Sequence, residues 1–140
     1  MLFRSKLKKT QHALRLHMDA ALKAIDLTTP QYAVLAQLEM EGGISNAELA
    51  RRSFITAQTM HGIVQNLENR GLIKRENAPK NNRILSTTLT KQGLSTVQKA
   101  HRLIKDIEND MTSTMTTSQK DLLENMLSEC LANLDSMTSP

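Results

Sequence analysis

Residues 45–71 read SNAELARRSFITAQTMHGIVQNLENRG and encode two short helices joined by a tight turn. Ser45 and Glu48 have the spacing of a capping box, in which the serine caps a helix and the glutamate bonds back to it. Thr56 is placed to cap a second helix, which Gly71 ends. Apolar residues recur in the second helix at helical spacing, which predicts one buried and one exposed face. The expected buried residues are Ala57, Met60, Ile63, Val64 and Leu67.

The apolar period changes from 3.6 to 2 after this helix pair. Residues 72–76 and 83–89 predict two antiparallel strands. The polar link 77–82, with one Pro and three Asn, predicts the hairpin loop. We expect Ile44 to make a one-residue sheet contact, and Leu85, Thr87 and Leu89 to point toward the core. Two short helices followed by a basic hairpin predict a winged helix-turn-helix.

Longer helices are expected on both sides of this unit, over residues 5–25, 30–41, 90–111 and 118–136. The spacings Thr28–Gln31 and Thr116–Gln119 predict further capping boxes, and Thr90 is placed to cap the helix before residue 111. The last helix carries two adjacent apolar stripes, a wider face than a surface helix needs, which an intramolecular core or, more often, a second copy would cover. The expected fold is therefore mainly α with a small β-hairpin wing.

Length and composition limit the class of protein. A chain of 140 residues suggests one domain. The single cysteine, Cys130, excludes an internal disulfide and fits a reducing cytoplasm. No apolar run approaches the ~20 residues that cross a bilayer, so we expect a cytoplasmic protein with no membrane partner.

The charge is concentrated in the middle of the chain. The net charge is +4, and residues 44–93 hold eight Lys or Arg against three Glu, a net of +5. A basic centre is typical of a nucleic-acid face. Ordinary surface charge is the alternative, and charge alone does not decide between them.

The second short helix fits a major groove about 12 Å wide. Gln can pair with adenine there, and Thr methyls suit thymine. Gly62, on the same face, costs about 1 kcal/mol relative to Ala, so close approach to DNA or to a neighbouring helix would explain it. The starts of the two helices, near Ser45 and Thr56, direct backbone amides toward phosphates. The expected DNA-reading residues are Thr56, Gln58, Thr59, His61 and Gln65, with Ser45 at the backbone. A merely solvated polar face is the alternative.

The hairpin adds basic side chains to this face. Arg83 is expected to enter the minor groove, whose negative potential attracts arginine. Lys74, Arg75 and Lys80 are expected to contact phosphates without regard to sequence.

Four motifs in order resemble the MarR family over residues 27–93. They are Leu27-Thr28-(x)2-Gln31-(x)2-Val34-Leu35, Asn46-(x)2-Leu49-Ala50, Leu67-Glu68-(x)2-Gly71-Leu72-Ile73-(x)-Arg75 and Arg83-(x)5-Leu89-Thr90-(x)2-Gly93. The resemblance implies one MarR-like domain over 1–140, with a winged helix-turn-helix at 28–90. It also implies that dimerisation helices, at 1–27 and 91–140, place the homodimer on a pseudo-palindrome. The family usually has Asp where this chain has Asn81, and the charge-assisted pair that would hold Arg83 is then lost.

Catalytic and metal-binding patterns are missing from the sequence. His12 and His17 do not share a helix face, His101 is isolated, and no Cys/His cluster has zinc spacing. We therefore expect no enzyme, no metal and no cofactor. Cys130 is expected to be a buried thiol on the apolar face of the last helix. Met18 and Met60 are candidates for an apolar pocket, which in the family takes small aromatic or lipophilic compounds; core filling is the alternative.

The sequence thus predicts a bacterial or archaeal transcription regulator, expected to be a repressor, that binds double-stranded DNA as a homodimer and is tuned by a small effector. The alternative is a winged-helix protein-interaction module without specific DNA binding. The basic block at 44–93 argues against this alternative, because a protein-binding wing does not need that charge.

Overall fold

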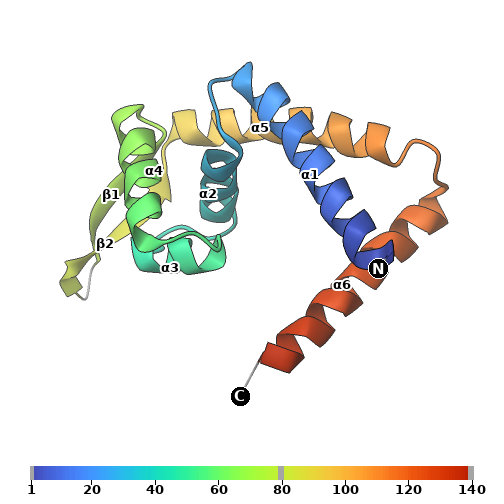
Figure 1. Cartoon of the computed structure of the whole chain (residues 1–140). Coiled ribbons are helices and arrows are strands. Elements are labelled where there is room, and N and C mark those ends of the chain that lie inside the picture. Colours follow the sequence, from blue (N-terminus) through green and yellow to red (C-terminus); the bar gives the residue numbers. More distant parts are fainter. Residues whose placement is uncertain (1, 79–80, 139–140) are drawn as a thin grey trace. The chain divides into compact units, whose positions relative to one another are not determined.

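The computed structural model describes residues 2–78 and 81–138, with the backbone alone at 78, 81–84 and 138. This part of the chain forms helices and one antiparallel hairpin (Figure 1). The elements are α1 (Leu2–Lys23), α2 (Thr29–Met40), α3 (Asn46–Arg52), α4 (Ala57–Asn69), β1 (Ile73–Ala78), β2 (Asn81–Leu89), α5 (Lys91–Met111) and α6 (Thr117–Thr138). The expected mainly α fold with a hairpin wing is confirmed.

The chain forms two compact units, Met1–Ile107 and Glu108–Pro140. The first contains α1 to β2 and most of α5, and the second contains the end of α5 and the whole of α6. The helix-turn-helix and its hairpin thus lie entirely within the first unit.

The core of the first unit is aliphatic, as the low aromatic content requires. Each of its helices contributes to one buried cluster, which includes Leu22 of α1, Leu35 of α2, Leu49 of α3 and Val97 of α5. From α4, the cluster takes Met60, Val64 and Leu67. Ile63 is only half-buried, and the expectation that Ala57 is buried is wrong, because this first residue of α4 is exposed.

Two of the three predicted capping boxes form completely. The Gln31 N–H donates to Thr28 Oγ1 at 3.2 Å, and the Thr28 N–H donates to Gln31 Oε1 at 3.0 Å. Thr116 and Gln119 repeat the pattern at 3.2 and 2.9 Å. These reciprocal bonds satisfy backbone donors that a helix start leaves free, which is why α2 and α6 begin where the sequence predicts.

Only one of the two hydrogen bonds of the third capping box forms. The Glu48 N–H donates to Ser45 Oγ at 3.2 Å, so the serine caps α3 as expected. The Glu48 carboxylate, however, is paired with Arg51 and Arg52. A charged guanidinium is a stronger donor than a neutral backbone amide, so the arginines of the same helix take this carboxylate.

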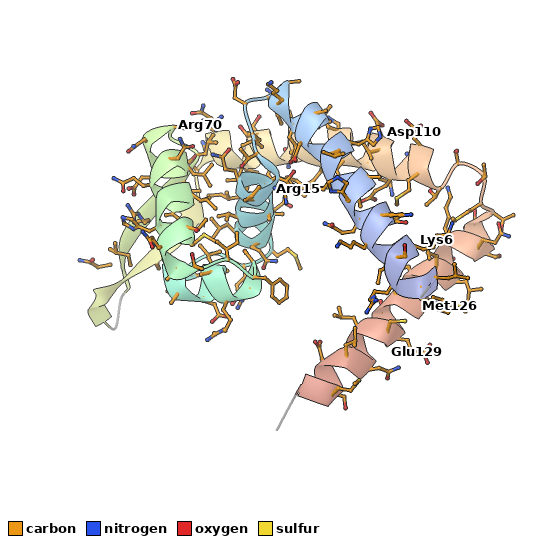
Figure 2. All side chains as sticks on the ribbon, in the orientation of Figure 1. Lys6, Arg15, Arg70, Asp110, Met126 and Glu129 are labelled. Atoms are coloured by element: carbon orange, nitrogen blue, oxygen red, sulfur yellow. The ribbon has the colours of Figure 1, made fainter. Side chains whose placement is uncertain are left out.

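A hydrogen bond between Thr29 and Asp19 connects α2 with α1. The Asp19 carboxylate accepts hydrogen bonds from the Thr29 hydroxyl at 2.5 Å and from Arg15 Nε at 3.0 Å. The Thr29 hydrogen bond, followed by that of Arg15, lowers the pKa of Asp19 below its ordinary value. Arg15, labelled in Figure 2, lies one turn before Asp19 on α1, and the first turn of α2 is thus held to α1.

The hairpin pairs Ile73 with Leu89 at its base. Ile44 forms the expected isolated bridge, to Thr87. The predicted loop at 77–82 is wrong, because β1 continues to Ala78 and β2 begins at Asn81, with an irregularity between Asn77 and Ala78. A hairpin that extends beyond the core has solvent on both faces, so polar residues there do not mark a loop.

The inward pattern expected for β2 holds only near the base. Thr87 is fully buried and Leu89 packs against the core, whereas Leu85 is 42% exposed. Leu85 lies farther along the hairpin, where no element covers the strand pair, and its expected inward position is therefore wrong.

Gly93 allows α5 to start directly against the strand region. A Cβ at this position would overlap the backbone carbonyl oxygen of Leu72. The same carbonyl accepts the Thr90 N–H at 3.1 Å, and Thr90 caps α5 by accepting the Gly93 N–H at 3.0 Å. The glycine of the fourth motif is thus required by a close backbone approach.

Candidate nucleic-acid interface

The outer face of α4 consists of exposed polar side chains. Thr56 has extended backbone at the N-cap, and its Oγ1 accepts the Thr59 N–H at 3.2 Å. Its hydroxyl also donates to Thr59 Oγ1 at 2.9 Å. The structure therefore brings the predicted base-reading residues together on one helix, and all of them are exposed: Thr56, Gln58, Thr59, His61 and Gln65. Figure 2 shows side chains projecting outward along this helix, which ends just before the labelled Arg70 at its C-cap.

Three of these side chains have unused hydrogen-bonding groups. Within the described part of the chain, Gln58, His61 and Gln65 make no side-chain hydrogen bond or ion pair. The amide of a glutamine offers two donors and an acceptor. The face is therefore able to pair with a polar ligand without first breaking internal contacts.

Ser45 lies at the start of α3 and is half-buried. Its hydroxyl is already used by the Glu48 N–H. Its contact with the DNA backbone stays a prediction.

Arg75 is positioned differently from the exposed basic residues. Its guanidinium donates to Glu68 Oε1 of α4 at 2.8 Å, and only 14% of its side chain is exposed. The hydrogen bond to Arg75 lowers the pKa of Glu68, and the same bond raises the pKa of Arg75. Arg75 thus holds β1 to α4, and a phosphate would have to compete with Glu68 for it.

Of the remaining predicted wing residues, only Lys74 has a side chain that the structure describes. Lys74 Nζ lies 3.4 Å from Glu76 Oε1, and both side chains are more than half exposed. An exposed pair of this kind is weak, so Lys74 can exchange its carboxylate for a phosphate. Lys80, and the side chains of Asn81 and Arg83, lie outside the described residues, and their predicted roles are untested.

Glutamates neutralise part of the basic block locally. Arg52 bonds to Glu41 at 2.7 Å and to Glu48 at 2.8 Å, and Arg51 pairs with Glu48. The Arg52–Glu41 pair holds α3 to the end of α2, and the two pairs with Glu48 lie within α3. The formal charge of the segment is therefore a poor guide to which of its cations face a ligand.

The two methionines of the predicted effector pocket belong to one hydrophobic cluster. Met60 is fully buried, and Met18 is half-buried and packs against the same core. Met18 comes from α1 and Met60 from α4, and both contribute to the core of the first unit. The pocket itself stays a prediction.

The structure reveals a polar cluster that the sequence does not. His101 of α5 lies 2.7 Å through Nδ1 from the Tyr32 hydroxyl and 2.7 Å through Nε2 from Glu39 Oε1. Both partners come from α2, so the expectation that His101 is isolated is wrong. The seven-residue spacing of Tyr32 and Glu39 places them on one face of α2, but the sequence does not show that α5 packs against that face.

The second unit presents an uncovered apolar surface. The cysteine expected to be buried on α6, Cys130, is exposed in the single chain. The large apolar side chains of this helix are 36–79% exposed: Leu122, Leu123, Met126, Leu127, Leu131, Leu134 and Met137. Monomeric proteins rarely expose so many neighbouring apolar side chains.

The described residues offer neither a metal-binding cluster nor a helix that could span a membrane. Among the described residues, no group of three or more His, Cys, Asp or Glu is arranged to hold a metal ion. No helix in this part of the chain has the length and hydropathy that a membrane span requires.

Comparison with known proteins identifies relatives that are transcriptional repressors. The sequence profile of the MarR family matches residues 25–84. The HTH-type transcriptional repressor Rv2887 of Mycobacterium tuberculosis is 31% identical over 114 residues, which are 81% of this chain and 82% of the relative.

Solved structures of related proteins share this fold, and their similarity extends over most of the chain. A complex of Rv2887 with DNA has a TM-score of 0.78 at 27% identity, covering 90% of this chain and 94% of that one. The complex of Rv2887 with salicylic acid has a TM-score of 0.75 at 29% identity, covering 89% and 92%. The transcriptional repressor CouR, bound to a 23-mer DNA duplex, has a TM-score of 0.82 at 26% identity, covering 90% and 89%.

Proposed function

This chain belongs to the MarR family of transcriptional regulators, and from this membership we propose that it is a repressor that binds duplex DNA as a homodimer. The observation that carries the proposal is the exposed outer face of α4, where Gln58, His61 and Gln65 have no side-chain hydrogen-bond partner among the described residues. The proposal gives the chain a regulatory role in the bacterial cytoplasm and no enzymatic one.

In the proposed complex, α4 enters the major groove. Gln58 and Gln65 pair with base edges, where a glutamine amide matches the donor and acceptor of adenine. Thr56 and Thr59 offer methyl groups to thymine, and His61 adds a further polar contact. Lys74, Lys80 and Arg83 hold the DNA backbone and the adjacent minor groove.

A homodimer explains the apolar surfaces at the two ends of the chain. On α1, Leu2, Phe3, Leu7 and Leu16 are 55–95% exposed, and the face of α6 is likewise uncovered. We assign residues 1–27 and 91–140 to dimerisation. A two-fold dimer presents two α4 helices to successive major grooves, about 34 Å apart, so the operator is an inverted repeat.

Selection of random-sequence duplexes by the purified protein, at two salt concentrations, tests this function. The proposal predicts recovery of an inverted repeat whose half-sites are about 10 bp apart, with affinity falling steeply as salt rises. Weak binding without any recovered motif would contradict sequence-specific regulation. A complete lack of DNA binding would favour the protein-interaction module instead.

We further propose that a small aromatic acid tunes the repressor. The relative Rv2887 forms a complex with salicylic acid as well as one with DNA. The proposed site lies where Met18 and Met60 approach the shared core. A ligand there acts by favouring a spacing of the two α4 helices that does not fit successive grooves.

Salicylate is the probe for this second part of the proposal. It should raise the thermal midpoint of the free protein and weaken its binding to the selected operator. Sodium acetate at the same concentration is the control for ionic strength. Equal effects of the two salts would contradict a specific effector site.

A further inference from the structure

Gly62 is an exposed glycine in the interior of α4. The helix runs without interruption from Ala57 to Asn69, with Gly62 at its sixth position. Glycine is the poorest helix former except proline, because it loses the most backbone entropy when it is ordered. The helix is unbroken, so a kink does not account for the glycine.

Packing within the chain does not require this glycine either. A Cβ built on Gly62 would meet no other atom within 4 Å. Gly93, by comparison, has a backbone carbonyl in that space. Of the two explanations that the sequence leaves open, a neighbouring helix of the same chain is therefore excluded among the described residues.

Gly62 occupies the middle of the polar face. Thr59 and Gln65 lie three residues before and after it, and Gln58 lies four before it, so all three are its surface neighbours on the helix. All are exposed. Gly62 has no side chain of its own, so a base edge can approach the backbone of the helix closely between these neighbours.

We propose that Gly62 is a specificity-determining residue of α4, at which the C5-methyl of a thymine occupies the volume of the absent Cβ. Gly62 offers no polar side-chain group, and the methyl of thymine is the apolar feature of the base edges in the major groove. A methyl against the Cα of a helix completes an apolar contact, whereas a polar base atom there would lose its hydrogen bond to water. The inference rests on the proposed DNA-binding function.

The test uses Gly62→Ala in the full-length protein, with the operator selected by the wild type. The variant should raise the thermal midpoint by a few degrees, because Ala favours the helix. It should also weaken operator binding by about tenfold or more, because the added methyl overlaps the thymine. Ser95→Ala, at an exposed position of α5, is the control and should leave operator binding unchanged.

Thymines of the operator are then replaced one at a time by deoxyuridine, which lacks the C5-methyl. One replacement in each half-site should restore binding of Gly62→Ala, while it weakens or leaves unchanged that of the wild type. If the wild type binds and Gly62→Ala binds equally well, the inference is wrong. Weakened binding that no deoxyuridine restores also overturns it. Failure of the wild type to select any operator would instead contradict the proposed function.

Discussion

At the scale of single residues, two arginines of the first unit join neighbouring elements. Arg75 joins β1 to Glu68 of α4, and Arg52 joins α3 to Glu41 of α2. The exposed amides of Gln58 and Gln65, by contrast, make no hydrogen bond to another element among the described residues. Ion pairs therefore hold the elements of the winged helix-turn-helix together, and the neutral amides of α4 remain available to contact DNA bases.

The Glu68–Arg75 pair makes stability depend on pH in acid. The folded-state pKa of Glu68 lies below its unfolded value, since Arg75 favours the carboxylate. The contribution of the pair is thus complete above the ordinary glutamate pKa of about 4.3, and it is lost as the pH falls through the lower folded value.

Glu68→Gln should lower the free energy of unfolding by about 1 kcal/mol at pH 7, the size expected for a charged hydrogen bond that solvent partly screens. The difference from the wild type should shrink as the pH falls below about 4. Urea unfolding between pH 3 and pH 7 measures it, with the exposed Glu108→Gln as the control. A difference that is constant with pH would contradict a role for the ionised carboxylate.

At the scale of elements, Gly62 of α4 and Gly93 of α5 have different surroundings. A Cβ at Gly93 would overlap the Leu72 carbonyl, whereas a Cβ at Gly62 would meet no atom of the described residues within 4 Å apart from the adjoining turns of its own helix. The same substitution should therefore have opposite effects on stability at the two positions.

Gly93→Ala should reduce the free energy of unfolding by about 2–4 kcal/mol, because its Cβ must displace the Leu72 carbonyl or the start of α5. Ser95→Ala, two residues later and exposed, should have a small effect of either sign. Chemical denaturation of both variants makes the comparison. A stable Gly93→Ala protein would show that α5 can move away from the strand at little cost.

Elements were predictable where local chemistry determines them. Helix starts at Thr28, Thr56, Thr90 and Thr116 follow from caps that need only three or four residues of sequence. The length of the hairpin and the fate of the Glu48 carboxylate were not predictable, because they depend on solvent exposure and on competing donors. The contact of His101 with α2 joins residues more than sixty positions apart, which no local pattern encodes.

In the candidate site, too, some features were predictable from the sequence and others were not. The exposed face of α4 follows from helical periodicity, and all of its predicted members are exposed. The engagement of Arg75 was missed, because spacing places it on the hairpin but does not reveal a carboxylate within reach on α4.

At the scale of the whole molecule, the uncovered apolar residues of α6 indicate that one chain is not the functional unit. Their burial against a second copy contributes about 25 cal/mol for each Å² removed from water. An obligate dimer often has no stable folded monomer, so dimerisation and stability are expected to be linked.

Leu127→Glu, at a 47% exposed position of α6, should shift the protein from dimer to monomer, because it places a charge in the apolar interface. The expected consequence for DNA is a loss of operator binding by two or more orders of magnitude, since one α4 helix reads half of the site. Sedimentation equilibrium gives the oligomeric state, and Asp121→Asn, which removes a charge on α6, is the control. A Leu127→Glu protein that remains dimeric would contradict this interface.

If the outer face of α4 reads bases, truncating its free amides must change the sequence that the protein selects. The test repeats the selection of random duplexes with Gln58→Ala/Gln65→Ala, which truncates two exposed side chains that have no hydrogen-bond partner among the described residues. The motif selected by the variant should have lost its preference at the base pairs these amides contact, with the salt dependence of binding unchanged because the phosphate contacts remain. Recovery of the wild-type motif at full strength by this variant would show that the outer face of α4 does not read bases.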